Sequence, residues 1–160
     1  MKYRTGIGFD VHAFAEDRKL IIGGVEIDYE KGLAGHSDAD VLLHSITDAL
    51  LGSLALGDLG KHFPDSDNKY KDADSKILLK HSYNLIKGKR YKIGNIDAVV
   101  TAQKPKLSPY IDDMRMVISK LLDTEIENVS VKATTTEKLG FIGREEGVAA
   151  FSTVLVFKSE

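Results

Sequence analysis

The chain has 160 residues, 29% of them charged, and a formal net charge of −2. This length fits one domain over residues 1–160, and the nearly balanced charge argues against a broad nucleic-acid-binding or membrane-binding surface. Because the sequence has no cysteine, disulfides are excluded, and any metal ion must be bound through nitrogen and oxygen. The N-terminus lacks an apolar signal core and no later stretch is long enough to cross a bilayer, so we expect a cytoplasmic protein.

Residues 2–12 are predicted to form the first strand, which Gly6 and Gly8 weaken. Side chains alternate between the two faces of a strand, so Asp10 and His12 should point the same way and form a two-residue chelator. Two short apolar runs, at residues 20–22 and 25–27, flank a Gly-Gly pair, which predicts a two-residue hairpin.

A helix is predicted to follow the loop at residues 31–35. Ser37 is the expected N-cap, and Asp40 three residues later completes a capping-box pattern. The apolar residues at helical spacing are Leu42, Ile46, Ala49, Leu50 and Leu54. His44 is spaced four residues from both Asp40 and Asp48, which places it in the second turn. We therefore hypothesise that one of these two carboxylates orients His44.

The remaining pattern predicts helices and strands in a mixed order. Residues 57–67 read as a loop, and a later helix is expected to be capped by Ser108 with Pro109 at its first position. The other predicted elements are a helix at residues 75–87 and strands at 91–102, 128–133 and 147–157, the last of them central. This order favours an α+β domain: a mixed β-sheet covered on one face by about three helices, plus a small β-hairpin.

The residues most suggestive of chemistry are Asp10, His12 and His44. Their carboxylate oxygen and imidazole nitrogens are zinc ligands, and three protein ligands would leave a fourth tetrahedral position open. The alternative makes the first two ordinary strand-end residues and pairs His44 with Asp40 or Asp48. Neither reading is decided by spacing alone.

Three of the chain's histidines fall outside this set. His36 lies beside the expected helix start, where it could donate a hydrogen bond to phosphate; the alternative is a loop histidine satisfied by the backbone. His81 is expected to be structural or solvated, and His62 has no assigned role.

Two later loops carry groups suited to phosphates. Residues 134–136 are three threonines followed by Glu137, a hard oxygen ligand for Mg²⁺ or Mn²⁺; the alternative is a capping box opening a short helix. Arg144 offers a bidentate phosphate contact, or else an ion pair with Glu145 or Glu146. The loop at residues 102–107 could hold a base and its phosphates, although a solvated connection is the simpler reading.

Six motifs occur in a fixed order: residues 8–12, 36–44, 58–60, 63–67, 102–106 and 132–140. With these motifs the chain resembles the 2-C-methyl-D-erythritol 2,4-cyclodiphosphate synthase family of the non-mevalonate isoprenoid pathway, over residues 3–157. The resemblance implies a phosphorus–oxygen lyase. The implied reaction is the conversion of 4-diphosphocytidyl-2-C-methyl-D-erythritol 2-phosphate to the cyclic diphosphate, with release of CMP.

The resemblance also implies an assembly and its cofactors. It implies a homotrimer with active sites between subunits, and room for an isoprenoid diphosphate in a central cavity. One Zn²⁺ per subunit would be bound by Asp10, His12 and His44, and Mg²⁺ or Mn²⁺ by Glu137 with the substrate diphosphate. His36 and Thr135 would stabilise the transition state.

Substrate contacts are implied for two sets of residues. Those near the metal and the erythritol are Asp10, Val11, His12, His36, Ser37, Asp58, Leu59, Gly60, Phe63, Pro64, Asp65, Ser66 and Asp67. Those near the cytidine and the diphosphate are Ala102, Gln103, Lys104, Pro105, Lys106, Leu107, Ser108, Thr134, Thr135, Thr136 and Glu137. Phe141 and Arg144 match positions near the substrate and a central trimer cavity.

The chain departs from the family pattern at two positions. Ala39 replaces a common glycine, which is harmless if the helix has already begun, and Lys104 replaces a small residue beside the cytosine pocket. Two other functions stay open. One is a metal-dependent phosphohydrolase of a nucleotide-activated polyol, and the other is a non-catalytic trimeric module that binds nucleotide or isoprenoid diphosphates.

Overall fold

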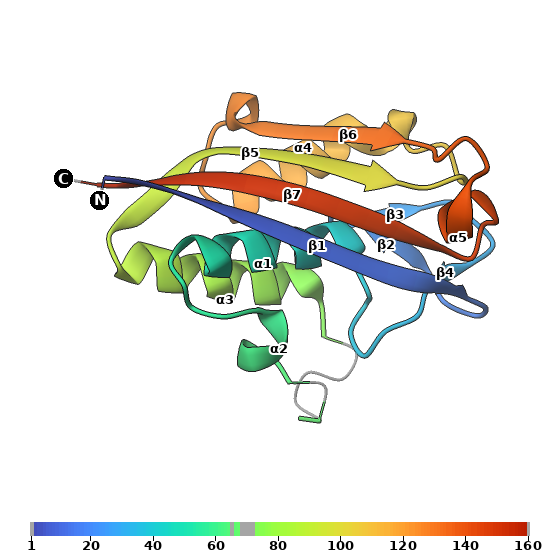
Figure 1. Cartoon of the computed structure of the whole chain (residues 1–160), viewed down its shortest axis with the longest axis horizontal. Coiled ribbons are helices and arrows are strands. Elements are labelled where there is room, and N and C mark those ends of the chain that lie inside the picture. The colour runs from blue at the N-terminus through green and yellow to red at the C-terminus, as the bar shows by residue number, and fades with distance from the viewer. Residues whose placement is uncertain (1, 65, 68–72, 160) are drawn as a thin grey trace.

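The computed structural model describes residues 2–64, 66–67 and 73–159. Its main feature is a five-stranded mixed sheet with the strand order β4-β1-β7-β5-β6. The strands are β1 (Tyr3–Ala15), β4 (Gly32–Leu33), β5 (Tyr91–Thr101), β6 (Val129–Thr134) and β7 (Gly147–Lys158). Only β5 and β6 pair in parallel, and β7 lies in the middle, as its apolar sequence predicts. Both chain ends lie together at one edge of the molecule, because Tyr3 pairs with Phe157 (Figure 1).

Three helices pack against the sheet: α1 (Val41–Ser53), α3 (Ser75–Gly88) and α4 (Ile111–Leu121). α1 contacts β1, β7 and α3, and almost all of its side chains are buried. α4 packs on β6, and its Met114 and Ile118 are fully buried (Figure 1). A separate hairpin of β2 (Leu20–Ile22) and β3 (Val25–Ile27) completes the predicted α+β fold. Among the described residues, no helix is long and apolar enough to span a membrane.

Two glycines bring β1 and α1 unusually close together. A Cβ at Gly6 would lie 1.9 Å from the carbonyl oxygen of Ala49, and one at Gly8 would lie 1.8 Å from that of Ser45. No other residue type fits at this distance. Because even-numbered β1 residues face α1, Asp10 and His12 point toward the start of that helix. The glycines that weaken the predicted strand are therefore what places it against the helix.

The opposite face of β1 and β7 is apolar and exposed. Ile7, Phe9 and Val11 are 72%, 49% and 42% exposed, and Phe151 is 46% exposed. The rings of Phe9 and Phe151 pack together with centroids 4.5 Å apart. Within one chain, the helices therefore cover one face of the sheet, as predicted, and leave this apolar row uncovered.

The start of α1 differs from the prediction. The N-cap is Asp40, whose side chain accepts hydrogen bonds from the backbone N–H groups of Leu42 and Leu43, so the prediction of Ser37 as N-cap is wrong. His44 consequently lies at the end of the first turn and not in the second. Ala39 precedes the cap with a φ of 57°, in the left-handed region that favours glycine. The helix has not begun at Ala39, so the reason for expecting this departure to be harmless does not hold.

Several short elements escape the sequence pattern. These are β4, α2 (Leu59–His62) and α5 (Gly140–Gly143), together with 3₁₀ turns η2 (Ser108–Tyr110) and η3 (Ile126–Asn128). Ser108 and Pro109 begin the η2 turn and not α4 itself, so Ser108 is not the cap of that helix. β1 also runs three residues beyond its predicted end, because it continues to pair with β4.

Candidate metal centre and active site

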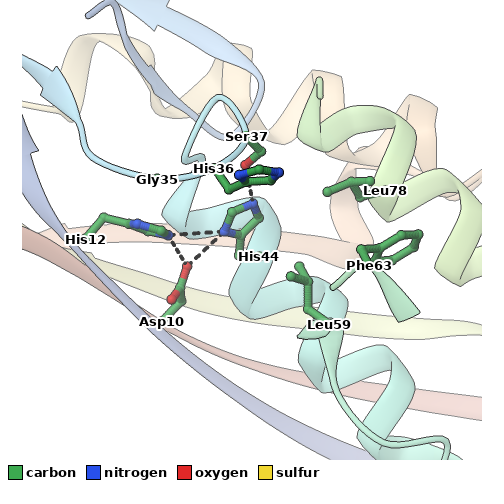
Figure 2. Close-up of a pocket in the computed structure, with 9 residues that line it drawn as sticks. All are labelled: Asp10, His12, Gly35, His36, Ser37, His44, Leu59, Phe63 and Leu78. Carbon is green, nitrogen blue, oxygen red and sulfur yellow. Dashed lines mark hydrogen bonds and ion pairs between the residues drawn. The ribbon is translucent and has the colours of Figure 1, made fainter. Parts of the chain in front are cut away.

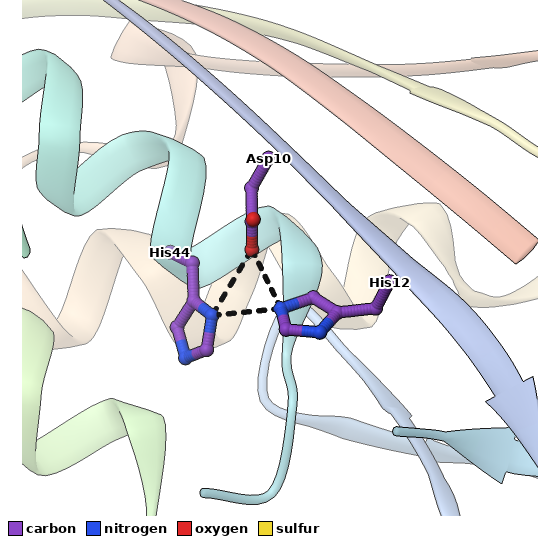
Figure 3. Close-up of side chains that lie close together, drawn as sticks. All are labelled: Asp10, His12 and His44. Carbon is purple, nitrogen blue, oxygen red and sulfur yellow. Dashed lines mark hydrogen bonds and ion pairs between the residues drawn. The ribbon is translucent and has the colours of Figure 1, made fainter. Parts of the chain in front are cut away.

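Three side chains from β1 and α1 meet at one point. Asp10 Oδ2 lies 2.8 Å from His12 Nε2 and 3.0 Å from His44 Nδ1, and these two nitrogens are 3.2 Å apart (Figure 3). Atoms bound to a tetrahedral zinc ion at about 2.0–2.1 Å lie roughly 3.3 Å from one another. The spacing fits three ligands of one metal ion. The alternative that pairs His44 with Asp40 or Asp48 is wrong.

The hydrogen bond at His12 Nδ1 determines the protonation of the other ring nitrogen, Nε2. His12 Nδ1 lies 2.6 Å from the carbonyl oxygen of Ala34. A carbonyl can only accept a hydrogen bond, so Nδ1 carries the proton, and a neutral ring presents the Nε2 lone pair to the Asp10 carboxylate. Two lone pairs at 2.8 Å require a cation or a second proton between them. The donor set therefore fits a divalent metal ion.

The proximity of these side chains shifts the pKa values of Asp10 and His12. Burial would raise the pKa of the Asp10 carboxyl, but the neighbouring imidazoles of His12 and His44 outweigh burial and hold that pKa well below its usual range. Burial would lower the pKa of His12, but its hydrogen bond to Asp10 leaves the pKa raised. Without a metal ion, a proton on His12 Nε2 therefore compensates the Asp10 charge.

The triad opens into a pocket of about 210 Å³. It is lined by Asp10, His12, Gly35, His36, Ser37, His44, Leu59, Phe63 and Leu78 (Figure 2). His36 Nε2 is buried, and among the described residues it has no hydrogen-bond partner. The alternative, a loop histidine satisfied by the backbone, has no support at Nε2 among these residues. With a proton on Nε2, this nitrogen beside the metal ligands would offer a hydrogen-bond donor to an anionic ligand in the pocket.

Neither predicted carboxylate orients His44. Asp40 accepts hydrogen bonds from the N–H groups of Gly23 and Gly24 in the hairpin, in addition to its bonds at the helix start. Burial raises the pKa of Asp40 to about 6, although these backbone bonds oppose the shift. Asp48 accepts the N–H of Leu59 at 2.7 Å and so holds the start of α2. Both carboxylates fasten backbone segments around the site.

Ser75, at the start of α3, takes the place predicted for those carboxylates. His44 Nε2 lies 2.8 Å from Ser75 Oγ and 3.2 Å from Ser37 Oγ. No sequence pattern points to Ser75, because it lies 31 positions from His44 and no motif joins them.

A second pocket, of about 460 Å³, lies where β5 and β6 end. Its lining residues are Ala102, Gln103, Lys104, Pro105, Lys106, Leu107, Ser108, Ala133, Thr134 and Thr135. The two predicted loops meet here: the N–H of Ala102 donates to the carbonyl of Thr134, and the N–H of Lys138 donates to Gln103 Oε1. Residues 102–107 therefore line a pocket and contact the second loop, and their role in binding a base stays a prediction. The two pockets share no lining residue.

Glu137 belongs to this second region and not to the triad. Its carboxylate is exposed and accepts a hydrogen bond from Thr135 Oγ1 at 2.8 Å. Residues 135–139 form no helix, so the capping-box alternative for Thr134 is wrong. Arg144 forms the ion pair considered as its alternative, with Nε 2.7 Å from Glu146 Oε1. Within one chain, Glu137, the candidate ligand of a second metal ion, therefore lies apart from the triad.

A model of the YgbB family matches residues 3–157. The chain belongs to the YgbB family. A 2-C-methyl-D-erythritol 2,4-cyclodiphosphate synthase from Clostridioides difficile is 62% identical over 153 residues, covering 96% of this chain and 95% of its own length. The same enzyme from Bacillus cytotoxicus is 60% identical over 156 residues, covering 98% and 99%.

Solved structures share the fold of this YgbB-family chain. The bifunctional IspDF from Campylobacter jejuni has a TM-score of 0.95 at 48% identity, over 99% of this chain and 43% of that longer chain. The CDP complex of IspF from Plasmodium falciparum has a TM-score of 0.87 at 36% identity, over 99% and 98% of the two chains.

The other predicted residues of the YgbB-family chain are distributed around the two pockets. Val11 N–H donates to Asp10 Oδ1, while its side chain points to the exposed face. Asp58 is the N-cap of α2, which brings Leu59 and Phe63 to the first pocket. Pro64, Ser66 and Asp67 form the following turn, and Asp65 lies outside the described residues.

Three side chains with open roles are also placed. Lys104 Nζ forms an ion pair with Glu145 at 3.2 Å, at the rim of the second pocket. His62 Nε2 lies 3.0 Å from the carbonyl oxygen of Leu56 and holds the loop before α2. His81 is exposed and packs edge-on against Phe63, as expected of a structural or solvated residue.

Proposed function

We propose that this chain converts 4-diphosphocytidyl-2-C-methyl-D-erythritol 2-phosphate to 2-C-methyl-D-erythritol 2,4-cyclodiphosphate and CMP. The observation that carries the proposal is the convergence of Asp10, His12 and His44 in a pocket beside His36 Nε2, which has no hydrogen-bond partner within the described part of the chain. Cyclodiphosphate synthases identical at about 60% of positions over nearly the full length support the same reaction. The comparisons give no support to the phosphohydrolase alternative.

The proposed zinc site uses the triad, with one ion per chain. When bound there, Zn²⁺ supplies Lewis acidity and a fixed position for a phosphate oxygen. Asp10 would contribute the negative charge that favours a divalent ion, and His12 and His44 would hold the ion from two different elements. His36 is proposed to donate from Nε2 to a phosphate oxygen and so to stabilise negative charge that develops during the transfer.

The second pocket is proposed to bind the cytidine end. Residues 102–108 offer backbone donors and acceptors for a base, and a relative is solved with CDP bound. Glu137 is proposed to hold Mg²⁺ or Mn²⁺ together with the substrate diphosphate, because its exposed carboxylate supplies hard oxygen ligands. Thr135 touches Glu137 and lines this pocket, which supports its proposed role in stabilising the transition state.

The active site is proposed to form between subunits of a homotrimer. Two observations support this: the two pockets share no lining residue, and Ile7, Phe9, Val11 and Phe151 leave an apolar row exposed. Such a row is typical of a surface that another protein covers. An isoprenoid diphosphate in a central cavity stays a prediction.

The reaction needs no nucleophile from the protein. The 2-phosphate oxygen attacks the β-phosphorus, the bond from that phosphorus to the CMP oxygen breaks, and CMP leaves with the electron pair. Holding the two groups in line is the main task, and intramolecular alignment is worth roughly 7–11 kcal/mol. The two pockets align these groups by binding both ends of one substrate.

Incubation with the cytidine diphosphate substrate, with and without a chelator, tests the proposal. Phosphorus NMR should show the cyclic diphosphate and CMP in equal amounts, and the chelator should suppress both. A linear phosphorylated product would indicate hydrolysis instead, and intact substrate in the presence of zinc and magnesium would indicate a binding module.

A further inference from the structure

A series of hydrogen bonds begins at His44 Nε2 and leads away from the pocket. Ser75 Oγ lies 2.8 Å from His44 Nε2, on the side of the ring opposite Asp10. The same oxygen forms a short hydrogen bond to Asp38 Oδ1, and Asp38 Oδ2 accepts the N–H of Ser75 at 3.1 Å. Ser75 is 1% exposed, so solvent water does not replace these partners.

The Asp38 carboxylate determines which atom donates in each hydrogen bond of this series. An ionised carboxylate can only accept, so the single hydroxyl proton of Ser75 goes to Asp38. The Ser75 oxygen is then left with lone pairs and must accept from His44. His44 therefore carries its proton on Nε2, and its Nδ1 has the lone pair that faces Asp10 and His12.

We propose that Ser75, aligned by Asp38, is a positioning residue that holds His44 in the Nε2–H tautomer and so keeps Nδ1 free to bind the metal ion. The inference rests on the zinc site of the proposed function and deepens it. A second contact, from Ser37 Oγ to the same nitrogen, is longer at 3.2 Å, and that oxygen also accepts the N–H of Ala39. Ser75 is therefore the principal acceptor.

Helix capping does not account for the Ser75 hydroxyl. The N-cap of α3 is Asp74, whose side chain accepts the N–H of Lys76. The bond from the Ser75 backbone N–H to Asp38 does not involve the hydroxyl either. Ser75→Ala consequently removes only the contacts of Oγ and leaves the start of the helix fastened.

Zinc affinity, measured by competition with a chromophoric chelator at fixed pH, tests the role without using turnover. Ser75→Ala should weaken zinc binding about 10–100-fold, the usual effect of losing a partner that orients a ligand. Ser75→Thr keeps the hydroxyl and should restore most of the affinity. Ser82→Ala is the matched control: it makes the same change on the buried face of α3, at a hydroxyl without a hydrogen-bond partner among the described residues, and should leave affinity unchanged.

A histidine nitrogen NMR measurement on the zinc-loaded full chain reads the tautomer directly. Wild-type protein should show His44 with metal-bound Nδ1 and a slowly exchanging proton on Nε2, and Ser75→Ala should exchange that proton faster. Wild-type affinity and slow exchange in Ser75→Ala would overturn the inference. If that variant does not fold, a proton on Nδ1 in the wild type would overturn it. Failure of the wild type to bind zinc would instead overturn the proposed metal site.

Discussion

Replacing Gly8 by alanine tests whether the close approach of β1 and α1 assembles the metal centre. The new Cβ would lie 1.8 Å from the carbonyl oxygen of Ser45, whereas carbon and oxygen normally approach to about 3.3 Å, so α1 must retreat by about 1.5 Å. Overpacking of this kind costs about 1–3 kcal/mol. Because the obstructing atom belongs to the backbone and cannot rotate away, we expect a loss near 3 kcal/mol in unfolding free energy.

The same movement should damage metal binding. Ser45 is next to His44 in α1, so a retreat of the helix carries His44 Nδ1 away from Asp10 Oδ2, now 3.0 Å distant. A credible metal site has ligand distances within about 0.2 Å of the ideal values. Urea unfolding gives the stability, and chelator competition on the folded protein gives the affinity for zinc.

Gly88→Ala provides the control for this experiment. It adds the same methyl group at the end of α3, where nothing lies within 4 Å. It should leave zinc affinity unchanged and raise stability by up to about 1 kcal/mol, because alanine loses less backbone entropy on folding. A Gly8→Ala protein that loses less than about 1 kcal/mol and binds zinc as the wild type does would refute the reasoning.

Four further predictions concern the ligands and the assembly. His44→Ala should abolish zinc binding while circular dichroism shows the fold retained; unchanged metal content would remove His44 from the site. Zinc affinity should fall about tenfold per pH unit below the raised pKa of His12, because a proton then competes at Nε2; a flat profile from pH 8 to 6 would contradict this. In the metal-free protein, the stabilisation from this histidine should be complete below pH 6.5 and lost as pH rises through its raised pKa. Ile7→Asp, at a position 72% exposed, should reduce the mass measured by light scattering and abolish turnover without loss of zinc; an unchanged mass would contradict the interface.

Local patterns predicted most of the fold because they have a direct physical cause. The alternation along β1 placed Asp10 and His12 on one face, and the Gly-Gly pair marked the hairpin, where Gly23 and Gly24 both have positive φ. The long apolar run of β7 marked a central strand. α2 could not be predicted in this way, since four residues are too few to show a helical period.

The errors at the start of α1 arise where tertiary contacts choose among equivalent local candidates. Ser37, Asp38 and Asp40 are all good N-cap residues. Asp40 is the cap because its carboxylate simultaneously binds the N–H groups of Gly23 and Gly24, which no local pattern contains. The alignment of Asp38 with Ser75 has the same origin, and it decides how His44 is oriented.

The separation of the two pockets argues that assembly is part of the proposed active site. The proposed substrate joins a phosphate and a diphosphate through one short polyol, so both proposed metal positions must lie within the reach of a single small molecule. In one chain, however, the cluster of ligand atoms contains Asp10, His12 and His44, while Glu137 lies with the second pocket. Zinc binding needs only the triad and should survive in a monomer. Turnover needs both pockets and should be lost in a monomer. Ile7→Asp is therefore expected to abolish turnover while zinc binding is retained.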